Sequence, residues 1–244
     1  MTDVCKFLEW DSEFFGSRIA RLNRAQPTAG EMRDALDWCS AERIACLYLL
    51  ADASDSGTTR LAEDNGFHFS DIRLTLLRHE TSAPGEWPAG IRIATDDDIK
   101  ALTPIAGASH TDSRFYSDPG FARERCDELY RVWIENSCRG YAQRVFVGEQ
   151  DGVAAGYITC HHDTDSGRVG LLGVASTARE NGMGGRLISA ALRHFADLGF
   201  KQTTVVTQGR NAGAQRLYTR YGFLPHRTEL WYHRWFSHPA QGNL

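Results

Sequence analysis

The segment RENGMGG, residues 179–185, carries the most informative local pattern in the chain. It follows the apolar run VGLLGVA (169–175), which predicts a strand, and precedes LISAALRHFADL (187–198), which has helical spacing. Glycine tolerates positive φ and lets a ligand approach the backbone because it has no Cβ. The N–H groups of such a turn converge, and the following helix N-terminus adds partial positive charge, which suits a pyrophosphate. We therefore predict an anion-binding turn, to which Arg179 adds a full charge and a planar donor fork.

Two other phosphate-binding loops do not fit this spacing. A Walker loop needs Gly-Lys-Ser/Thr, but Gly185 is followed by Arg186-Leu187. A dinucleotide fingerprint that starts at Gly182 needs its third glycine where Leu187 stands. On the local pattern alone, an ordinary strand-to-helix turn stays open as the alternative.

The regions around this turn predict an α/β fold around a mixed, mostly antiparallel sheet. Gln150-Asp151-Gly152 separates two strand-like runs and is a good hairpin signal. The expected order is two helices, an antiparallel meander and then β-α-β-α-β: helices at 94–110 and 122–138, strands at 144–149, 153–160 and 169–175, a long helix, a strand at 203–208, a short helix and a strand ending near Phe236.

Proline and glycine interrupt the chain most clearly in ETSAPGEWPAG (80–90). We predict a small N-terminal α/β unit at 1–80, a linker at 81–90, a main domain at 91–236 and a tail at 237–244.

The two parts are weakly similar at an offset of 156 residues (216 minus 60). Arg60-Leu61 corresponds to Arg216-Leu217, and Gly66-Phe67 to Gly222-Phe223. This repeat is either chance, since Gly-Phe is common after a helix, or evidence that the N-terminal unit is a truncated copy of the main fold. The copy lacks the glycine-rich turn, and it has Asp55 and Ala62 at the positions of Asn211 and Tyr218. We expect it to be structural.

Together with a second motif, NAGAQRLY (211–218) followed by Tyr221-Gly222-Phe223, the pattern R-x-x-G-x-G resembles the GNAT superfamily of N-acetyltransferases. The resemblance covers roughly Ile91–Phe236 and implies a GNAT fold, preceded by a truncated GNAT-like unit. It also implies acetyl-CoA as cosubstrate and no metal.

The resemblance implies these coenzyme-binding residues: Leu172, Gly173, Val174, Arg179, Asn181, Gly182, Met183, Gly184, Gly185, Asn211 and Tyr218. Residues 172–174 would splay from the neighbouring strand, and the N–H near Val174 would hold the developing oxyanion. Tyr218 would be catalytic and donate a proton to the departing thiolate, because a phenol is protonated at neutral pH. The alternative for Tyr218 is a helix residue that packs its ring on the core.

The acceptor side is suggested by WDSEFFG (10–16), Ser113-Arg114-Phe115 and Trp133–Asn136. These resemble the dTDP-amino-sugar acetyltransferases, which acetylate the 4-amino group of a dTDP-linked 4-amino-4,6-dideoxygalactose. In the loop 110–120, Arg114 is predicted to meet a diphosphate, and Phe115 and Tyr116 to stack on thymine or a sugar. The alternative is an exposed loop whose aromatic rings pack back into the core.

The sequence does not single out a general base. The candidates are Asp112, Asp118, Glu135 and Asp163, or a water chain that ends on a backbone carbonyl. His161-His162-Asp163 is interpreted as a polar turn rather than a metal site. The expected chemistry is direct attack of the amine, since no cysteine is paired with a base in the pattern.

Composition limits the classes of protein. The chain has 244 residues, 42% hydrophobic, with a formal net charge of −4, which does not suggest a nucleic-acid partner. No basic leader and no apolar run of about 18 residues is present, and the six cysteines are scattered without a C-x-x-C pair. We expect a cytoplasmic enzyme with a small-molecule amine acceptor and no membrane partner, and a homodimer is possible through an edge strand near the C-terminus. The competing functions are acetylation of a peptide or antibiotic amine, and acyl-CoA binding without catalysis, against which Tyr218 argues.

Overall fold

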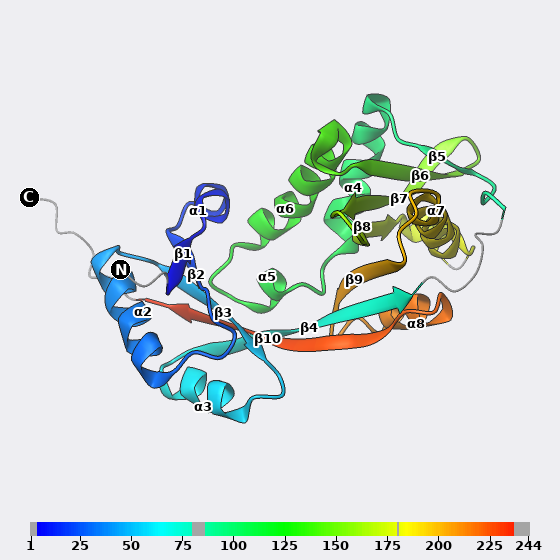
Figure 1. Cartoon of the computed structure of the whole chain (residues 1–244). Coiled ribbons are helices and arrows are strands. Elements are labelled where there is room, and N and C mark those ends of the chain that lie inside the picture. Colours follow the sequence, from blue (N-terminus) through cyan, green and yellow to red (C-terminus); the bar gives the residue numbers. More distant parts are fainter. Residues whose placement is uncertain (1–3, 80–85, 180, 237–244) are drawn as a thin grey trace, which may run out of the picture. The chain divides into compact units, whose positions relative to one another are not determined.

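A computed structural model describes residues 4–79, 86–179 and 181–236 (Figure 1). The described elements are, in chain order, β1 (Cys5–Phe7), α1 (Glu9–Phe15), β2 (Ile19–Leu22), α2 (Ala29–Ala41), β3 (Cys46–Asp52), α3 (Ser56–Asp64), β4 (His68–His79), β5 (Ile91–Ile93), η1 (Asp96–Asp98), α4 (Ile99–Ser109), α5 (Arg114–Ser117), α6 (Arg123–Asn136), η2 (Ser137–Tyr141), β6 (Arg144–Gln150), β7 (Val153–His162), β8 (Gly167–Val174), η3 (Ser176–Ala178), α7 (Met183–Asp197), β9 (Gln202–Gln208), α8 (Ala212–Arg220) and β10 (Leu224–Trp235).

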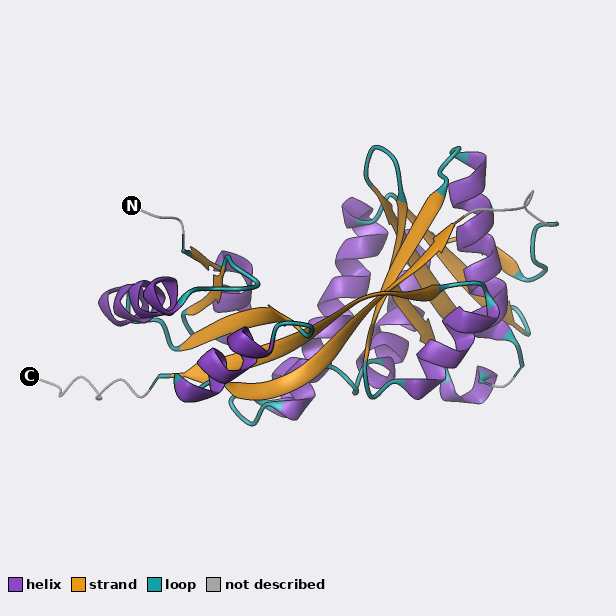
Figure 2. Cartoon of the chain, turned by 60° about the horizontal axis from the view of Figure 1, so that its bottom comes forward, coloured by secondary structure: helices purple, strands orange, loops and turns teal. Residues whose placement is uncertain are grey.

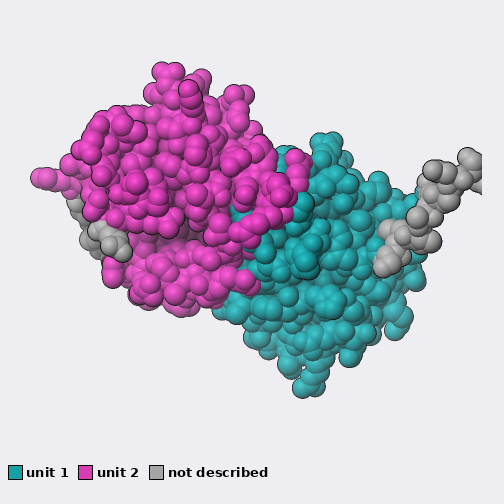
Figure 3. Space-filling view, turned by 180° about the vertical axis from the view of Figure 1, so that it is seen from behind, with its two compact units in different colours: residues 1–73, 114–122, 228–244 teal, residues 74–113, 123–227 magenta. Residues whose placement is uncertain are grey.

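The chain divides into two compact units that do not follow the predicted boundary at 81–90 (Figure 3). The first unit comprises residues 1–73, 114–122 and 228–244, and the second comprises 74–113 and 123–227. The sequence division differs from this one because Glu229–Trp235 of β10 pair antiparallel with Cys46–Asp52 of β3, which assigns residues 228–236 to the first unit. Residues 81–85 of the expected linker, residue 80 before it and the expected tail lie outside the described residues.

The first unit contains a sheet in the order β1-β2-β3-β10-β4. α2 begins with a capping box, in which Thr28 Oγ1 accepts from the Glu31 N–H at 3.2 Å and the Glu31 carboxylate accepts from the Thr28 N–H at 2.8 Å. The helix buries Met32, Ala35 and Cys39, which lie at helical spacing on one face. β10 lies between β3 and β4, so the expectation of an edge strand near the C-terminus is wrong and lends no support to a homodimer.

The second unit contains strands in the order β4-β9-β8-β7-β6-β5. Neighbours from β5 to β8 are antiparallel, and β8 is parallel to β9. Helices cover both faces of this sheet (Figure 2). Met183 of α7 is buried against Gly148 and Gly156: a Cβ on Gly148 would clash with its sulfur, and one on Gly156 would lie 3.2 Å from its Cγ. The predicted α/β fold with a mixed sheet is therefore confirmed. The predicted hairpin turn joins β6 to β7 and has positive φ at Asp151 and Gly152.

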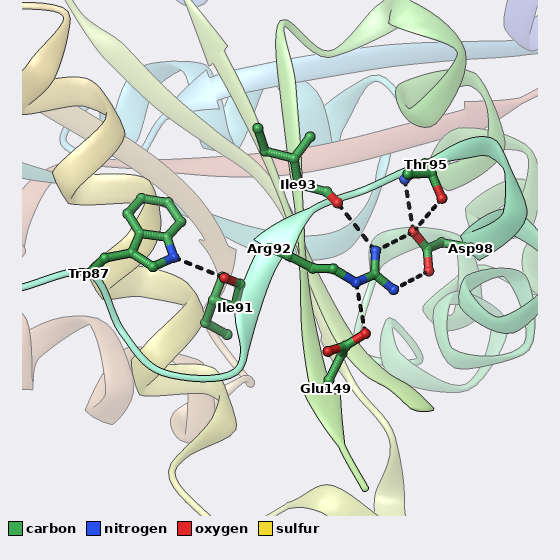
Figure 4. Close-up of polar contacts among 7 residues, drawn as sticks. All are labelled: Trp87, Ile91, Arg92, Ile93, Thr95, Asp98 and Glu149. Atoms are coloured by element: carbon green, nitrogen blue, oxygen red, sulfur yellow. Dashed lines mark hydrogen bonds and ion pairs between the residues drawn. The ribbon is translucent and has the colours of Figure 1, made fainter. Parts of the chain in front are cut away.

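An ion-pair network holds β5, the last strand in this order, in place (Figure 4). Arg92 of β5 donates two bonds of 2.7 Å to the Asp98 carboxylate and one of 2.7 Å to Glu149 of β6. Hydrogen bonds from Arg92 lower the pKa of Asp98 to about 2, so the carboxylate stays ionised. The Asp98 carboxylate also accepts from the Thr95 N–H at 2.8 Å, which holds the entry to α4 beside the sheet.

The weak sequence repeat corresponds to a repeat of secondary structure. β9, α8 and β10 begin and end 156 residues after β3, α3 and β4, as in Ser56–Asp64 and Ala212–Arg220 (212 minus 56). The order α-β-α-β is therefore present twice. The helices that precede β3 and β9 also correspond: α2 ends at Ala41 and α7 ends at Asp197, which is the same offset of 156 residues (197 minus 41).

Candidate active site

Strand β8 opens at one edge where the coenzyme-binding segment was predicted. Its parallel pairing with β9 extends from Gly167↔Thr203 to Val169↔Val205, whereas its antiparallel pairing with β7 continues to Gly156↔Val174. Residues 172–174 thus have a ladder partner on the β7 side alone among the described strands. The expected splay is confirmed, and it leaves backbone groups of this segment available to a ligand.

A one-residue irregularity precedes the open segment. The register with β7 shifts between Ile158 and Cys160, and the Leu171 N–H donates to Thr159 Oγ1 at 2.8 Å instead of to a strand carbonyl. Such bulges re-aim a strand and occur often beside functional sites. Here the bulge lies directly before Leu172.

The glycine-rich turn leads into α7 as predicted. Gly182 has φ 72° and is the N-cap, and the Arg186 N–H donates to its carbonyl at 3.0 Å. The N–H groups of residues 183–185, in the first turn of α7, have no intrahelical acceptor, and N–H groups of this kind can bind an anion. Arg186 Nη1 donates to the Asn181 carbonyl at 2.9 Å and braces the turn. Glu180 lies outside the described residues.

The members of this turn have different surroundings. A Cβ on Gly185 would clash with the Tyr221 hydroxyl, and one on Gly184 would lie 3.2 Å from Leu217 Cδ2. These two glycines let α8 approach α7, while Met183 has its side chain in the core at 1% exposure. Any ligand contact by these residues must therefore use their backbone N–H groups.

Arg179 is exposed and follows the short η3 helix. Its Nε donates to the Val174 carbonyl at 3.4 Å, which brings the guanidinium next to the end of β8. The predicted anion contact of Arg179 and the predicted thioester segment are thus neighbours in space.

Asn211 and Tyr218 lie at the start and near the end of α8. The Asn211 side chain accepts from the Ala214 N–H at 2.9 Å, so its oxygen caps the helix. Tyr218 is 5% exposed and packs on Phe223, with ring centroids 5.8 Å apart. Burial raises the pKa of Tyr218, so the phenol stays protonated at neutral pH, as a proton donor requires. Its catalytic role stays a prediction.

Arg114 occupies an aromatic cage in the first unit. Its guanidinium carbon lies 4.2 Å from the ring centroids of Tyr48, Phe115 and Trp231. Such contacts stabilise a cation through the ring quadrupole. The cage holds a full positive charge in one place.

A hydrogen-bonded chain orients this arginine. Arg114 Nη1 lies 2.8 Å from His233 Nε2, and because a guanidinium only donates, Nε2 must accept. The ring proton is then on Nδ1 and points to Asp118, 2.5 Å away. Burial lowers the pKa of His233 to about 4, so this neutral form is the one present at pH 7. Burial raises the pKa of Asp118, but hydrogen bonds from His233 and Trp235 outweigh it and hold that pKa below its usual value.

Phe115 and Tyr116 were predicted to stack on the acceptor. Phe115 is 5% exposed and stacks on Phe15 at 5.2 Å, while Tyr116 is half-buried. Acceptor stacking by these two residues stays a prediction. The Phe115 ring is largely covered and already contacts the guanidinium of Arg114.

The structure narrows the candidates for a general base. Asp118 is buried and its carboxylate is already hydrogen-bonded to His233. Glu135 forms an ion pair of 2.8 Å with Arg139, so neither carboxylate is an unengaged base. His161 and His162 belong to β7 rather than to a turn, and the described residues contain no group of three potential metal ligands. His110, which was not among the sequence-based candidates, has its Nε2 2.9 Å from the Tyr157 hydroxyl. The signal was a tyrosine inside the apolar strand VAAGYITC.

Residues 109–223 match the family described as "Acetyltransferase (GNAT) family". The chain therefore carries a GNAT acetyltransferase domain and is an acetyl-CoA-dependent N-acetyltransferase. None of the described helices is long and apolar enough to cross a membrane.

Two curated relatives align with most of the chain. It is 28% identical to the dTDP-fucosamine acetyltransferase of Escherichia coli O6:H1 over 236 residues, which cover 93% of this chain and 96% of that protein. It is 27% identical to the spore coat polysaccharide biosynthesis protein SpsD of Bacillus subtilis over 191 residues, 78% of this chain and 66% of that protein. A mycothiol acetyltransferase of Parafrankia sp. is 41% identical over 76 residues, 31% of this chain and 22% of that protein.

Solved structures support the fold. A GCN5-related N-acetyltransferase from Sphaerobacter thermophilus matches 95% of this chain and 76% of its own with a TM-score of 0.67 and 15% identity. A tandem GNAT protein from the clavulanic acid biosynthesis pathway matches with a TM-score of 0.60 and 15% identity, covering 92% of this chain and 77% of its own. The predicted GNAT fold is confirmed.

Proposed function

We propose that the chain transfers the acetyl group of acetyl-CoA to the 4-amino group of a dTDP-4-amino-4,6-dideoxyhexose in the cytoplasm. The observation that carries the proposal is the alignment with dTDP-fucosamine acetyltransferase, which extends over 93% of the chain and so includes the N-terminal elements as well as the GNAT domain.

The coenzyme is proposed to lie along the open edge of β8. The backbone of Leu172, Gly173 and Val174 would hold the pantetheine arm and the thioester, with the N–H near Val174 stabilising the oxyanion. The N–H groups of Asn181, Gly182, Met183, Gly184 and Gly185, together with the Arg179 guanidinium, would hold the pyrophosphate. Asn211 would contact the pantetheine through its side-chain amide.

The chemistry is proposed to be direct transfer. The amine attacks the thioester carbonyl, a tetrahedral intermediate forms, and Tyr218 protonates the thiolate as it leaves. A covalent cysteine intermediate finds no support, because burial raises the pKa of the Cys160 thiol and removes its nucleophilic form.

On the acceptor side, Arg114 is proposed to bind a phosphate of the nucleotide. The cage of Tyr48, Phe115 and Trp231 and the bond to His233 preorganise its guanidinium, so little side-chain entropy is lost on binding. Tyr116, which is half-buried beside it in α5, is the residue proposed to stack on the base or sugar.

The test is thiol release from acetyl-CoA with a panel of amines: dTDP-4-amino-4,6-dideoxy sugars, a peptide amine and an aminoglycoside. Turnover confined to the nucleotide sugars is expected. Turnover of another amine alone would replace the proposed acceptor. Tight coenzyme binding without turnover of any amine would indicate a binding module.

A further inference from the structure

His110 directly follows α4 and begins the loop 110–120, which is predicted to contact the acceptor. Two aromatic residues of the second unit hold its ring. Its Nε2 lies 2.9 Å from the Tyr157 hydroxyl of β7. Its ring stacks on Tyr130 of α6, with centroids 4.5 Å apart and planes inclined by 21°. A half-buried histidine with this much support has a fixed orientation.

Tyr157 connects His110 to the proposed thioester segment. The Tyr157 side chain is fully buried, and a Cβ on Gly173 would lie 2.5 Å from its ring and 2.8 Å from its hydroxyl. The phenol thus lies against the backbone of Gly173, next to Val174. His110 is therefore one hydrogen bond away from a side chain that touches this part of β8.

The hydrogen bond can also select the tautomer of His110. If Nε2–H donates to the Tyr157 oxygen, the lone pair of the neutral ring is on Nδ1. Nδ1 has no hydrogen-bond partner among residues 4–79, 86–179 and 181–236. Nδ1 is then a proton acceptor that the protein itself does not occupy.

We propose that His110 is the general base of the transfer reaction and that Tyr157 is its positioning residue, an inference that rests on the proposed acetyl transfer. As the amine nitrogen bonds to the thioester carbon, its proton passes to His110 Nδ1, directly or through one water molecule. The C–S bond then breaks, and the thiolate takes a proton from Tyr218. The imidazolium returns its proton to solvent, and Tyr218 regains one, so the sum is amine plus acetyl-CoA to amide plus free thiol.

The surroundings of His110 keep it neutral. The titratable groups that face it are Tyr157 from β7 and Tyr130 from α6, and Cys138 of η2 acts on Tyr157. Burial lowers the pKa of His110 to about 4. Because this pKa is depressed, the lone pair is present throughout pH 6 to 8 and is lost only as the pH falls toward about 4.

The proposal is tested in the full chain with His110→Ala and His110→Gln, using whichever amine of the panel the wild-type chain acetylates. Gln can keep a hydrogen bond to Tyr157 but is not a base. Both variants are expected to lose about 100-fold in kcat while acetyl-CoA affinity, measured by calorimetry, changes less than about twofold. His226→Ala, an exposed histidine of β10, is the control and is expected to retain activity.

Two readouts separate a base from a structural residue. Added imidazole is expected to restore activity to His110→Ala but not to Tyr218→Phe. The kcat of His110→Ala is expected to rise about tenfold per pH unit as hydroxide replaces the base, with a flatter wild-type profile. Tyr157→Phe is expected to lose about tenfold in kcat, because the ring still fills the space beside Gly173 but no longer fixes the tautomer.

The outcomes distinguish the two proposals. Wild-type turnover with an amine other than a nucleotide sugar would overturn the proposed acceptor and still test His110. His110 variants within about threefold of wild type, or an equal loss of coenzyme affinity, or parallel pH profiles without rescue, would overturn the base assignment. A chain that acetylates no amine would overturn both.

Discussion

The elements α2-β3-α3-β4 and α7-β9-α8-β10 have the same order, yet the turns and caps that lead into their helices differ. α2 begins with the Thr28–Glu31 capping box, which satisfies the N–H groups of Thr28 and Glu31 within the chain. α7 begins at Gly182 in the left-handed region and has no side-chain cap among the described residues, so the N–H groups of its first turn have no capping acceptor there. The comparison teaches that two helices in equivalent places of a repeated fold can start differently. The start of α7, and not the fold alone, is therefore the feature on which the proposed anion site depends.

The second helices of the two copies show the same contrast. Asp55 caps α3 by accepting from the Gly57 N–H at 3.0 Å, much as Asn211 caps α8. Ala62, however, is a fully buried small residue where α8 has Tyr218. The N-terminal copy thus keeps the structural role of each position and lacks the hydroxyl that the reaction would use.

The strongest test of this contrast is Tyr218→Phe. Turnover is expected to fall by about 100-fold or more, because the thiolate loses its proton donor, while acetyl-CoA affinity changes less than about twofold. Steady-state kinetics and calorimetry measure the two quantities. Equal losses in both would show that Tyr218, like Ala62, only fills space.

Arg179→Ala is expected to weaken acetyl-CoA binding by about tenfold, since a charge-assisted contact to an anion is lost. Arg24→Ala, in the segment that leads to α2, is the matched control. Arg24 forms only a surface ion pair of 3.5 Å with Glu31, so calorimetry should find unchanged coenzyme affinity. A similar effect of both substitutions would mean that general charge, not the turn, attracts the coenzyme.

Gly182→Ala is expected to lower the free energy of unfolding by about 1 kcal/mol, because alanine is strained at φ 72°. Gly30→Ala in the first turn of α2 is its counterpart. A Cβ there meets nothing closer than 3.9 Å, and the helix is expected to gain a few tenths of a kcal/mol or up to about 1 kcal/mol. Urea denaturation checks both values, and destabilisation by Gly30→Ala would contradict the contrast.

The smallest expected difference is between the two caps. Asn211→Ala and Asp55→Ala should each cost about 1 kcal/mol of stability through loss of a helix cap. Asn211→Ala should in addition weaken coenzyme binding by a few-fold, since only that side chain is proposed to contact the pantetheine. Equal coenzyme affinity in both variants would reduce Asn211 to a cap.

Local patterns predicted the second unit well. TTVVTQ at 203–208 lies within β9, and the hairpin at Asp151-Gly152 joins β6 to β7, because both depend on neighbours in sequence. α1 was missed because it buries none of its residues and so presents no apolar stripe. The division into units was missed because the pairing of β10 with β3 joins strands about 180 residues apart, for which no local signal exists.

The same limit applies to the site. The turn at 179–185 and the motif at 211–218 are each contiguous in the chain, so their residue types alone could be matched to a chemistry. His110 and Tyr157 are 47 residues apart and meet only because α4 packs on β7. Asp118 could be named as an acid from the sequence, but its engagement with His233 was not visible there.

The cage around Arg114 also provides an optical reporter. Its guanidinium lies over the Trp231 ring, and the indole N–H of Trp235 donates to Asp118 at 3.0 Å. A cation on an indole face shifts and quenches its emission, so a phosphate that pairs with the caged Arg114 guanidinium and neutralises its charge should change the fluorescence of the unlabelled chain. Titration of nucleotides against tryptophan emission, with Trp231→Phe as the blank, would then rank acceptors without any turnover.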